Sequence, residues 1–492
     1  MHNEEPTLHF YGGPYIALIP TLIFILLSGV FTIVFHYYSL KALTISALVG
    51  LVIVFFLAKN RKQYWNTIVS GLAHFGNAKL IFVFLIIGVF TKLLVVGKVG
   101  QGFVWLSLLF GMHGAAFTIL AFVGTAVFAL GSGVPFAALF AALSIFYVPG
   151  ILVGSNPAIL AGAIIGGVYC GDAFSPSSQL TNATLGLETN STTGQPADLV
   201  KTLKQRIPWI AGAAVLTIIL LAVFGGQGGT AHSSAALAKF SDPRGLWMLI
   251  PIVVVVYICV RTKEILTGLT WGVVVGTVVG LMTQLFQFSD VISIDPHNPT
   301  LLSGILFDGV YSMVDISLLT IFLYGLIAIM HGSGVVKLIC EWITSHKFVR
   351  TPRGAELTIA AGIGLVNILL SGCDLPGILL FGEMSDRIGH AARISPERRT
   401  YLIITVATSF TGIIPINSVY VMGVISVATQ MQGKFPFLPV PSPLAIFTAT
   451  FFSLILTVIW LCWVIFGWGR TMEPEAQKVS EEKVGSKHVS AV

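Results

Sequence analysis

The chain has 492 residues and a formal net charge of +6, with a mean hydropathy of +0.89. Apolar residues make up 55% of the chain and charged residues only 10%, whereas about 25% of residues are charged in an ordinary soluble domain. So few polar groups could not cover a soluble surface, which excludes a soluble enzyme, a nucleic-acid-binding module and a disordered chain. The composition predicts an all-α polytopic membrane protein.

The apolar runs follow one another in two similar sets. A membrane-spanning helix needs about 20 apolar residues. In the first half of the chain such runs lie at 14–35, 38–57, 78–97, 100–170 and 207–226. In the second half they lie at 245–260, 264–285, 303–335, 354–390, 400–426 and 443–468. Each half therefore offers three spans, a long apolar stretch and further spans.

The basic residues give these spans a direction. They gather in clusters between the apolar runs, at 59–62, 201–206, 261–263, 337–353, 387–399 and from 470 onward. Cytoplasmic loops of membrane proteins carry the excess of Lys and Arg. With all clusters inside, both termini are cytoplasmic, and the expected location is the inner (plasma) membrane, crossed several times.

The same orientation divides the chain into units. We expect a cytoplasmic N-terminus, a first repeat, an extracytoplasmic connection, a second repeat and a disordered cytoplasmic tail, at 1–13, 14–230, 231–244, 245–470 and 471–492. The first repeat begins inside and the second outside. Two similar units of opposite orientation form an inverted-topology repeat, which is typical of secondary transporters.

Glycine and proline interrupt both halves at matching places. Pro135 and Pro176 in the first half are 41 positions apart, and Pro376 and Pro415 in the second are 39 apart. Broken backbone at membrane depth is tolerated only where it is buried in protein or lines a cavity. We therefore expect each repeat to contain a re-entrant hairpin and a broken transmembrane helix. The hairpin tips are expected at 131–136 and 371–377, the helix breaks at 171–182 and 409–418, and all four near mid-membrane.

Asp172 is the strongest candidate for chemistry. It ends a stretch of 73 residues, 99–171, that contains no Asp, Glu, Lys or Arg. An ionisable residue inside the membrane is costly and points to function, although a carboxylate that hydrates at a helix end would be the structural alternative. Hydroxyl and amide oxygens suit a small hard cation. The predicted ion-coupling set, with Asp172 as the tentative ligand of a transported Na⁺, is Asp172, Ser175, Ser178, Thr181 and Asn182.

The second half offers mainly neutral polar groups at its predicted break. Residues 400–433 contain no charged residue, and one carboxylate, Asp374, lies at the predicted hairpin tip. Neutral hydroxyls and amides can hydrogen-bond a substrate. The predicted substrate-binding set is Ser132, Gly133, Asp374, Thr408, Thr411 and Asn417.

The segment 161–182 resembles the NhaC-type sodium/proton antiporter family. It reads AGAIIGGVYCGDAFSPSSQLTN, close to the family pattern A-G-A-I-I-S-G-x-x-x-G-D-x-x-S-P-x-S-D-x-T-N. The resemblance implies an ion-transporter-superfamily fold and secondary active transport. Several carboxylates of the family pattern are replaced here: Gln179 and Cys373 stand where the family has aspartate, and the acidic pair of the second broken helix is missing.

Two functions remain open at this point. The leading interpretation is a sodium/proton antiporter of the NhaC type. The alternative is a sodium- or proton-coupled transporter of a small organic metabolite, an amino acid or a carboxylate, because fewer fixed carboxylates leave room for an organic substrate. An enzyme is not expected, since intramembrane aspartyl proteases need a Tyr-Asp pair that this chain lacks. The expected partners are a transported cation and proton, a small organic substrate in the alternative, and the lipid bilayer. No cofactor and no nucleic acid is expected, and a homodimer is left open.

Overall fold

The computed structural model describes residues 8–73, 75–229, 234–294, 302–414, 417–433 and 435–473. Among these described residues, nine helices are long and apolar enough to cross a membrane. A tenth span results if α22 (Pro443–Ala449) and α23 (Phe451–Phe466), which meet at a 59° bend, are counted as one. The predicted all-α polytopic membrane protein is confirmed.

The first half of the chain has a helix in each predicted apolar run and two helices outside them: α3, which begins within the basic cluster at 59–62, and α9. Its elements are η1 (Pro14–Leu18), α1 (Ile19–Ile33), α2 (Leu40–Phe55), α3 (Arg61–Ala73), α4 (Phe75–Val96), α5 (Val99–Phe110), α6 (Ala115–Ser132), α7 (Pro135–Leu152), α8 (Pro157–Phe174), α9 (Gln179–Leu187) and α10 (Leu199–Phe224).

The second half adds a short antiparallel pair of strands to a similar series of helices. Its elements before the bent pair are α11 (Ser234–Lys239), η2 (Pro243–Met248), α12 (Leu249–Thr262), α13 (Ile265–Met282), α14 (Phe288–Val291), β1 (Ser293–Ile294), β2 (Leu302–Ser303), α15 (Ile305–Ser312), α16 (Val314–Gly332), α17 (Val335–Ser345), η3 (Lys347–Arg350), α18 (Pro352–Leu369), α19 (Asp374–Ala391), α20 (Pro396–Ile413) and α21 (Val419–Gln432). In the strand pair, Ser293 faces Ser303 and Ile294 faces Leu302.

Local chemistry explains where the long apolar stretches divide. The stretch 100–170 becomes four helices, and two of them, α7 and α8, begin with proline in the first turn. Proline is favoured there because the first helical N–H has no partner in any case. The helix α20 begins in the same way, and all three of these helices are 18 residues long.

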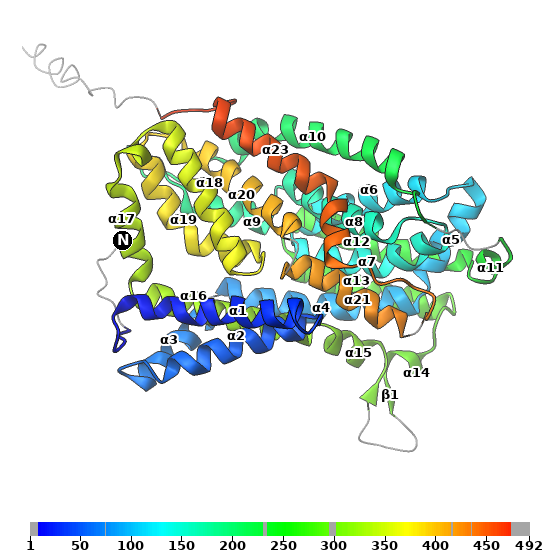
Figure 1. Cartoon of the computed structure of the whole chain (residues 1–492). Helices are drawn as coiled ribbons and strands as arrows, with labels where there is room; N and C mark the ends of the chain where they lie inside the picture. The colour runs from blue at the N-terminus through cyan, green and yellow to red at the C-terminus, as the bar shows by residue number, and fades with distance from the viewer. Residues whose placement is uncertain are drawn as a thin grey trace, which may run out of the picture.

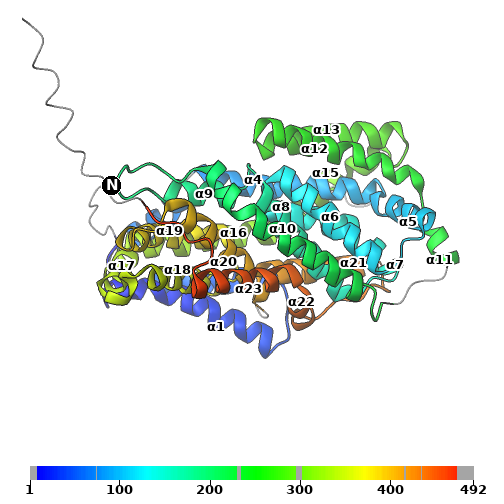
Figure 2. The same cartoon turned by 90° about the horizontal axis from the view of Figure 1, so that it is seen from above.

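Helices of the two halves pack against one another along the molecule, for example α2 and α3 on α16 and α4 on α13 and α15. The long helices α1, α10 and α16 run across Figure 1. The helices α17, α18 and α19 lie at the left end, whereas α5, α6 and α11 lie at the right end. In the view from above, α12 and α13 form one edge and α1 the opposite edge (Figure 2). The pairs α8–α9 and α20–α21 lie in the interior, with α6 packed on α8 and α18 packed on α20.

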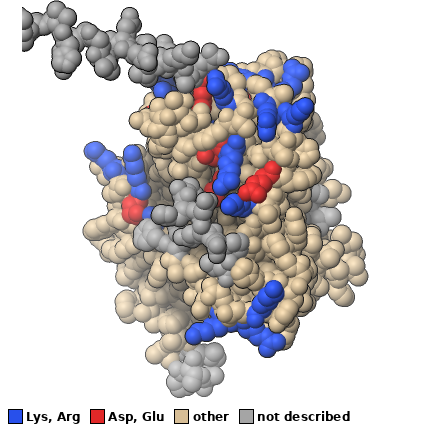
Figure 3. All heavy atoms as spheres, turned by 90° about the vertical axis from the view of Figure 1, so that its left-hand side faces the viewer, with Lys and Arg blue, Asp and Glu red and all other residues tan. Residues whose placement is uncertain are grey.

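Figure 3 looks onto the left end of the molecule and shows Lys and Arg side chains spread over it. The bases Lys59, Arg61, Lys337 and Arg353 from the predicted cytoplasmic clusters are exposed. Three other arginines from those clusters are not: Arg206, Arg398 and Arg399 are at most 1% exposed. The loop interpretation was therefore wrong for these three, because the helices that carry them begin before the apolar run does.

Arg398 and Arg399 are buried with acidic partners. The Arg398 Nε lies 2.7 Å from the Glu356 carboxylate, and both side chains are fully buried. Arg399 lies 3.0 Å from Glu188 and 3.1 Å from Asp386. These pairs join α18, α19, α20 and the segment after α9, so they fix the left end of the molecule.

The first residues assigned to the predicted tail are bonded to the segment between α19 and α20. Thr471 accepts a hydrogen bond from the Ser395 amide at 3.0 Å, and the Glu473 amide donates to the Arg393 carbonyl at 2.8 Å. Residues 471–473 are therefore ordered against that segment. The residues 1–7, 230–233, 415–416 and 474–492, which include parts of the predicted termini, connection and second break, lie outside the described part of the chain.

Candidate functional site

Each hairpin tip is bonded to the helix break of its own half. The Gln179 amide, at the start of α9, donates to the Gly133 carbonyl between α6 and α7 at 2.9 Å. In the second half the Val419 amide, at the start of α21, donates to the Ser371 carbonyl between α18 and α19 at 2.8 Å. The two hydrogen bonds join matching places in the two halves, the turn between two helices and the start of a third helix.

Serine supports both breaks in the same way. Ser178 caps α9 by accepting from the Thr181 amide, and Ser418 caps α21 by accepting from the Val421 amide. A serine at the N-cap satisfies an amide that has no partner within the helix. In both halves, the helix that follows the break therefore begins at a serine N-cap.

Gly133 allows the first tip to approach its break closely. Its φ of +63° lies in the left-handed region, which side chains rarely adopt. A Cβ placed on Gly133 would also overlap the backbone of Ser177. Glycine is therefore required at this position for both its conformation and its size.

Asp172 lies at the first break in a fully buried position. It is the third residue from the end of α8. Its Oδ2 accepts a hydrogen bond from the Ser178 hydroxyl at 2.9 Å, while its Oδ1 and the hydroxyl of buried Thr181 have no hydrogen-bond partner. A buried carboxylate must be neutralised by a proton, a cation or a hydrogen-bond network. Asp172, Ser178 and Thr181 thus leave two polar atoms available to a small cation.

The other predicted residues of the first site hold the backbone in place. The Ser175 hydroxyl donates to the Leu130 carbonyl at 2.7 Å, and the Asn182 amide donates to the Ser178 carbonyl at 2.8 Å. The Ser132 hydroxyl lies 3.4 Å from the Ala129 carbonyl in its own helix. These side chains bond mainly to nearby backbone groups, and Ser175 also bonds the Ser177 hydroxyl, so they shape the backbone of the first half at the tip and the break.

Asp374 lies at the start of α19 and is also buried. Thr411 donates to its Oδ1, and the Tyr169 hydroxyl donates to its Oδ2 at 3.2 Å. Thr411 is the third residue from the end of α20, which is the position that Asp172 has in α8. Tyr169 comes from the first half and Asp374 from the second, so this bond links the two halves at the centre of the molecule.

Thr408 and Asn417 have other partners. The Thr408 hydroxyl donates to the Ile404 carbonyl at 2.8 Å in its own helix. The Asn417 amide donates to Ser28 at 2.8 Å and accepts from Thr32 at 3.0 Å, so both ends of its side-chain amide bind α1. Asn417 therefore fastens the second break to α1.

Further polar groups lie outside both predicted sets. Buried polar atoms without a hydrogen-bond partner also occur on Asn367, Ser371 and Thr405, and Ser371 belongs to the predicted hairpin tip at 371–377. The ring of Tyr420 packs on Tyr169 with centroids 5.0 Å apart. No sequence signal marked Tyr420, because its contact with Tyr169 joins segments that are distant in the chain.

Arg206 is the most consequential residue that was missed. It is 1% exposed, its Nε and Nη1 have no hydrogen-bond partner, and it interacts electrostatically with Asp172. Helical spacing could have revealed it, because it belongs to the inward stripe of α10. That stripe consists of Thr202, Arg206, Ile210, Ala213, Thr217 and Leu221.

Within the described residues, no group of three or more His, Cys, Asp or Glu side chains is arranged to hold a metal ion. No protein-family model matches the chain. The Malate-2H(+)/Na(+)-lactate antiporter of Bacillus subtilis (strain 168) is 23% identical over 419 residues, which are 81% of this chain and 85% of that protein. This similarity assigns the chain to the secondary transporters as a class.

Two solved structures align at lower similarity. The Alcanivorax borkumensis YdaH transporter is 15% identical with a TM-score of 0.45, over 92% of this chain and 99% of that chain. The Neisseria gonorrhoeae MtrF protein, described within a class of antimetabolite efflux pumps, is 12% identical with a TM-score of 0.36, over 76% of this chain and 80% of that chain.

Proposed function

We propose that the protein is a cation-coupled secondary transporter of small organic carboxylates. The observation that carries the coupling is the Asp172 carboxyl, fully buried at the break between α8 and α9 with Oδ1 unpaired. A cation or proton that enters with the substrate neutralises this carboxyl, and its departure restores the charge. The occupancy of Asp172 is thereby linked to the conformations that the carrier can adopt.

Asp374 provides a second coupling position. Its two oxygens already accept from Tyr169 and Thr411, and an anionic substrate would be repelled by another carboxylate. We therefore move Asp374 from the predicted substrate-binding set to the coupling set. Two buried carboxyl groups, one from each half, give the carrier two places for Na⁺ or a proton.

The repeated geometry supports alternating access. The paired tip and break of each half, the matching lengths of α8 and α20 and the hairpins that enter from opposite ends (Figure 1) support two inverted repeats. Such repeats expose a central site alternately to the two sides of the membrane. The neutral break of the second half leaves space for an organic substrate between them.

The substrate class is proposed from the distant relative together with the charges at the centre. That relative exchanges malate and lactate according to its name. Arg206 supplies a buried guanidinium with two unpaired nitrogens near Asp172, and a guanidinium binds carboxylates well. Malate, lactate and related small carboxylates are thus the first candidates.

Transport into proteoliposomes tests the proposal. We expect radiolabelled malate or lactate to accumulate when a sodium or proton gradient is imposed, and to stop accumulating when the gradient is collapsed. A panel of amino acids serves as the comparison. Sodium/proton exchange that proceeds at full rate with no organic substrate present, and no uptake of any carboxylate, would instead favour the antiporter of the NhaC type.

A further inference from the structure

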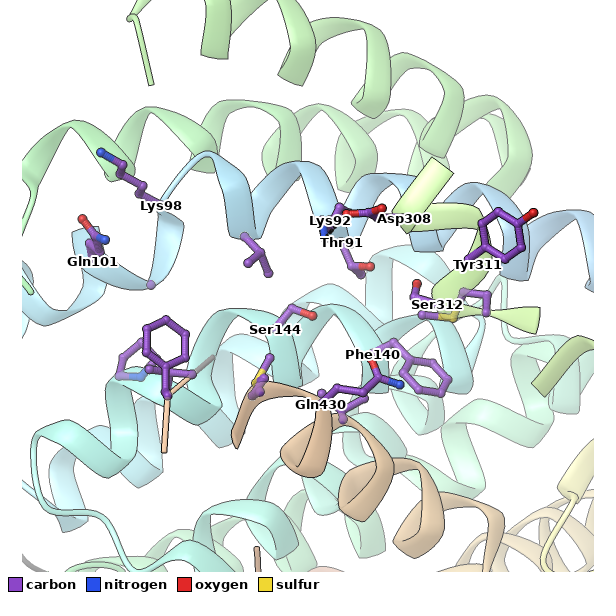
Figure 4. A pocket seen from close by; sticks show the side chains of 18 of the residues that line it. Thr91, Lys92, Lys98, Gln101, Phe140, Ser144, Asp308, Tyr311, Ser312 and Gln430 are labelled. Atoms are coloured by element: carbon purple, nitrogen blue, oxygen red, sulfur yellow. Dashed lines mark hydrogen bonds and ion pairs between the residues drawn. The ribbon is translucent and has the colours of Figure 1, made fainter. Parts of the chain in front are cut away.

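A cavity with a mixed polar and apolar lining lies away from Asp172 and Asp374, neither of which lines it. It has a volume of about 480 Å³ and is lined by residues of α4, α5, α7, α15 and α21, which belong to both halves (Figure 4). Small-molecule sites have volumes of roughly this size. Lys98 follows the end of α4 and Gln430 lies near the end of α21, so on the predicted orientation the cavity faces the outside.

The charges around this cavity favour an anion. Lys92 and Lys98 both line it. Lys92 pairs with Asp308 at 2.7 Å, and Lys98 lies 3.9 Å from Asp242. Hydrogen bonds from Arg244 hold the pKa of Asp242 below its usual value, so Asp242 stays ionised and is already occupied by that arginine. The cations Lys92, Lys98 and Arg244 thus outnumber the carboxylates Asp308 and Asp242.

A row of aromatic rings runs from the lining of the cavity to Asp374. Phe140 of α7 lines the cavity, and Phe136 lies one helical turn earlier. The Phe136 ring stacks on Tyr420 of α21, with centroids 4.3 Å apart and planes 26° apart. Tyr420 packs on Tyr169, whose hydroxyl reaches Asp374. The stacked pair joins an element of the first half to one of the second, so a movement of the halves would part the rings.

We propose that this cavity is an outward antechamber that receives small organic anions, and that the Phe136–Tyr420 pair is the gate between it and the central site. The role of the antechamber in transport rests on the proposed function. The anion preference of the antechamber and the barrier formed by the rings do not depend on the proposed function. Both can therefore be measured without a transported substrate.

Charge selection is tested with a cysteine at Ser144, which lines the cavity. The Ser144→Cys protein is treated with the anionic reagent sulfonatoethyl methanethiosulfonate and with its cationic trimethylammonium analogue. Gln227→Cys, at an exposed position beyond α10, gives the reference rates, and the parent protein gives the blank. We expect the anionic reagent to be favoured about fivefold at Ser144→Cys relative to the reference, and Lys98→Gln to remove most of that preference.

Equal relative rates for the two reagents, or a preference that Lys98→Gln leaves unchanged, would overturn the anion antechamber. A failed carboxylate uptake assay together with the expected rates would overturn the proposed function and leave the antechamber standing.

The gate is tested with a native thiol. Cys373 is 3% exposed and lies beside Asp374 and Tyr420, on the far side of the stacked rings. We expect Phe136→Ala to speed modification of Cys373 by sulfonatoethyl methanethiosulfonate at least tenfold, and Cys373→Ala in the same background to abolish this increase above the signal of the other cysteines. Phe136→Leu, which keeps most of the bulk, should give a smaller increase and serves if Phe136→Ala does not fold. Unchanged modification in both variants would overturn the gate.

Discussion

At the residue scale, the centre of the molecule is defined by charges without a full set of partners. Asp172 and Arg206 are both buried, and each retains polar atoms that bind nothing. Leaving such atoms unpaired in a folded protein costs stability. Asp172 lies at a helix break and Arg206 on the inward face of α10. Unpaired polar atoms there are expected of a site that exchanges ligands, in contrast to Arg398, whose guanidinium is bound by Glu356, Tyr401 and backbone carbonyls.

Asp172→Asn should abolish gradient-driven uptake while the protein still folds, because asparagine keeps the size and the contact with Ser178 but cannot carry a proton or hold a cation by charge. Uptake in proteoliposomes and thermal unfolding in detergent measure the two effects. The exposed carboxylate Glu341 offers the control: Glu341→Gln should transport normally. Full coupling in Asp172→Asn would count against the role of this carboxyl.

Arg206→Gln should strengthen the response to sodium. Removing this positive charge leaves Asp172 more attractive to a cation. We expect the loss of one buried charge that interacts with Asp172 to raise the sodium affinity about tenfold. The sodium concentration for half-maximal binding, measured without an organic substrate, should therefore fall by about that factor, whereas the KM for the carboxylate should rise because Arg206 is its proposed partner. Lys204→Gln, an exposed neighbour on the same helix, should have no effect. An unaltered sodium dependence in Arg206→Gln would mean that the two groups are not coupled.

The sequence carries a clear signal at the first candidate site and a weaker one at the second. Asp172 stands out because no charged residue precedes it for 73 positions. Thr411 and Asn417 carry no comparable signal. Thr411 binds Asp374 and Asn417 binds α1, and both contacts depend on packing between distant segments. Tyr169 was read as part of a motif, although its hydroxyl bridges the two halves.

At the element scale, short breaks determine the architecture. Glycine and proline marked the interruptions correctly because their backbone preferences are local. The sequence could not place α5 within the long run 100–170, since hydropathy alone does not divide a continuous apolar stretch.

Gly133→Ala tests the close approach of the first tip and break. The left-handed conformation costs roughly 1–2 kcal/mol for a residue with a side chain, and here the new Cβ would also overlap Ser177. The matched control is Gly194→Ala, because Gly194 has a similar φ of +65° and open space around it. We expect Gly133→Ala to lower both thermal stability and uptake, and Gly194→Ala to change stability only slightly. Similar behaviour of the two variants would show that packing at the tip is unimportant.

At the scale of the whole molecule, the left end is joined by buried ion pairs. Glu356 binds Arg398 at 2.7 Å and Arg470 at 2.6 Å, so it connects α18, α20 and the segment after α23. The sequence indicated loops for these arginines because charge clusters usually mark loops. Their burial follows from helices that extend beyond the apolar run.

Glu356→Gln should destabilise the protein by about 3–5 kcal/mol, since it leaves buried guanidinium groups without a counter-charge. The change is measured as a lowered midpoint of thermal unfolding in detergent. Lys79→Gln breaks a pair that is partly open to solvent, Lys79 with Glu264, and should cost about 0–1 kcal/mol. Equal effects from the two substitutions would contradict the structural role of the buried pairs.

The central claim is that Asp172 carries the cation whose movement drives an organic anion across the membrane. The most direct measurement follows radiolabelled sodium and a radiolabelled dicarboxylate in the same proteoliposomes, for the parent protein and for Asp172→Asn. The account predicts that the two fluxes are linked in the parent and that Asp172→Asn loses both the sodium flux and the accumulation of the dicarboxylate. Linked fluxes that persist in Asp172→Asn would contradict it.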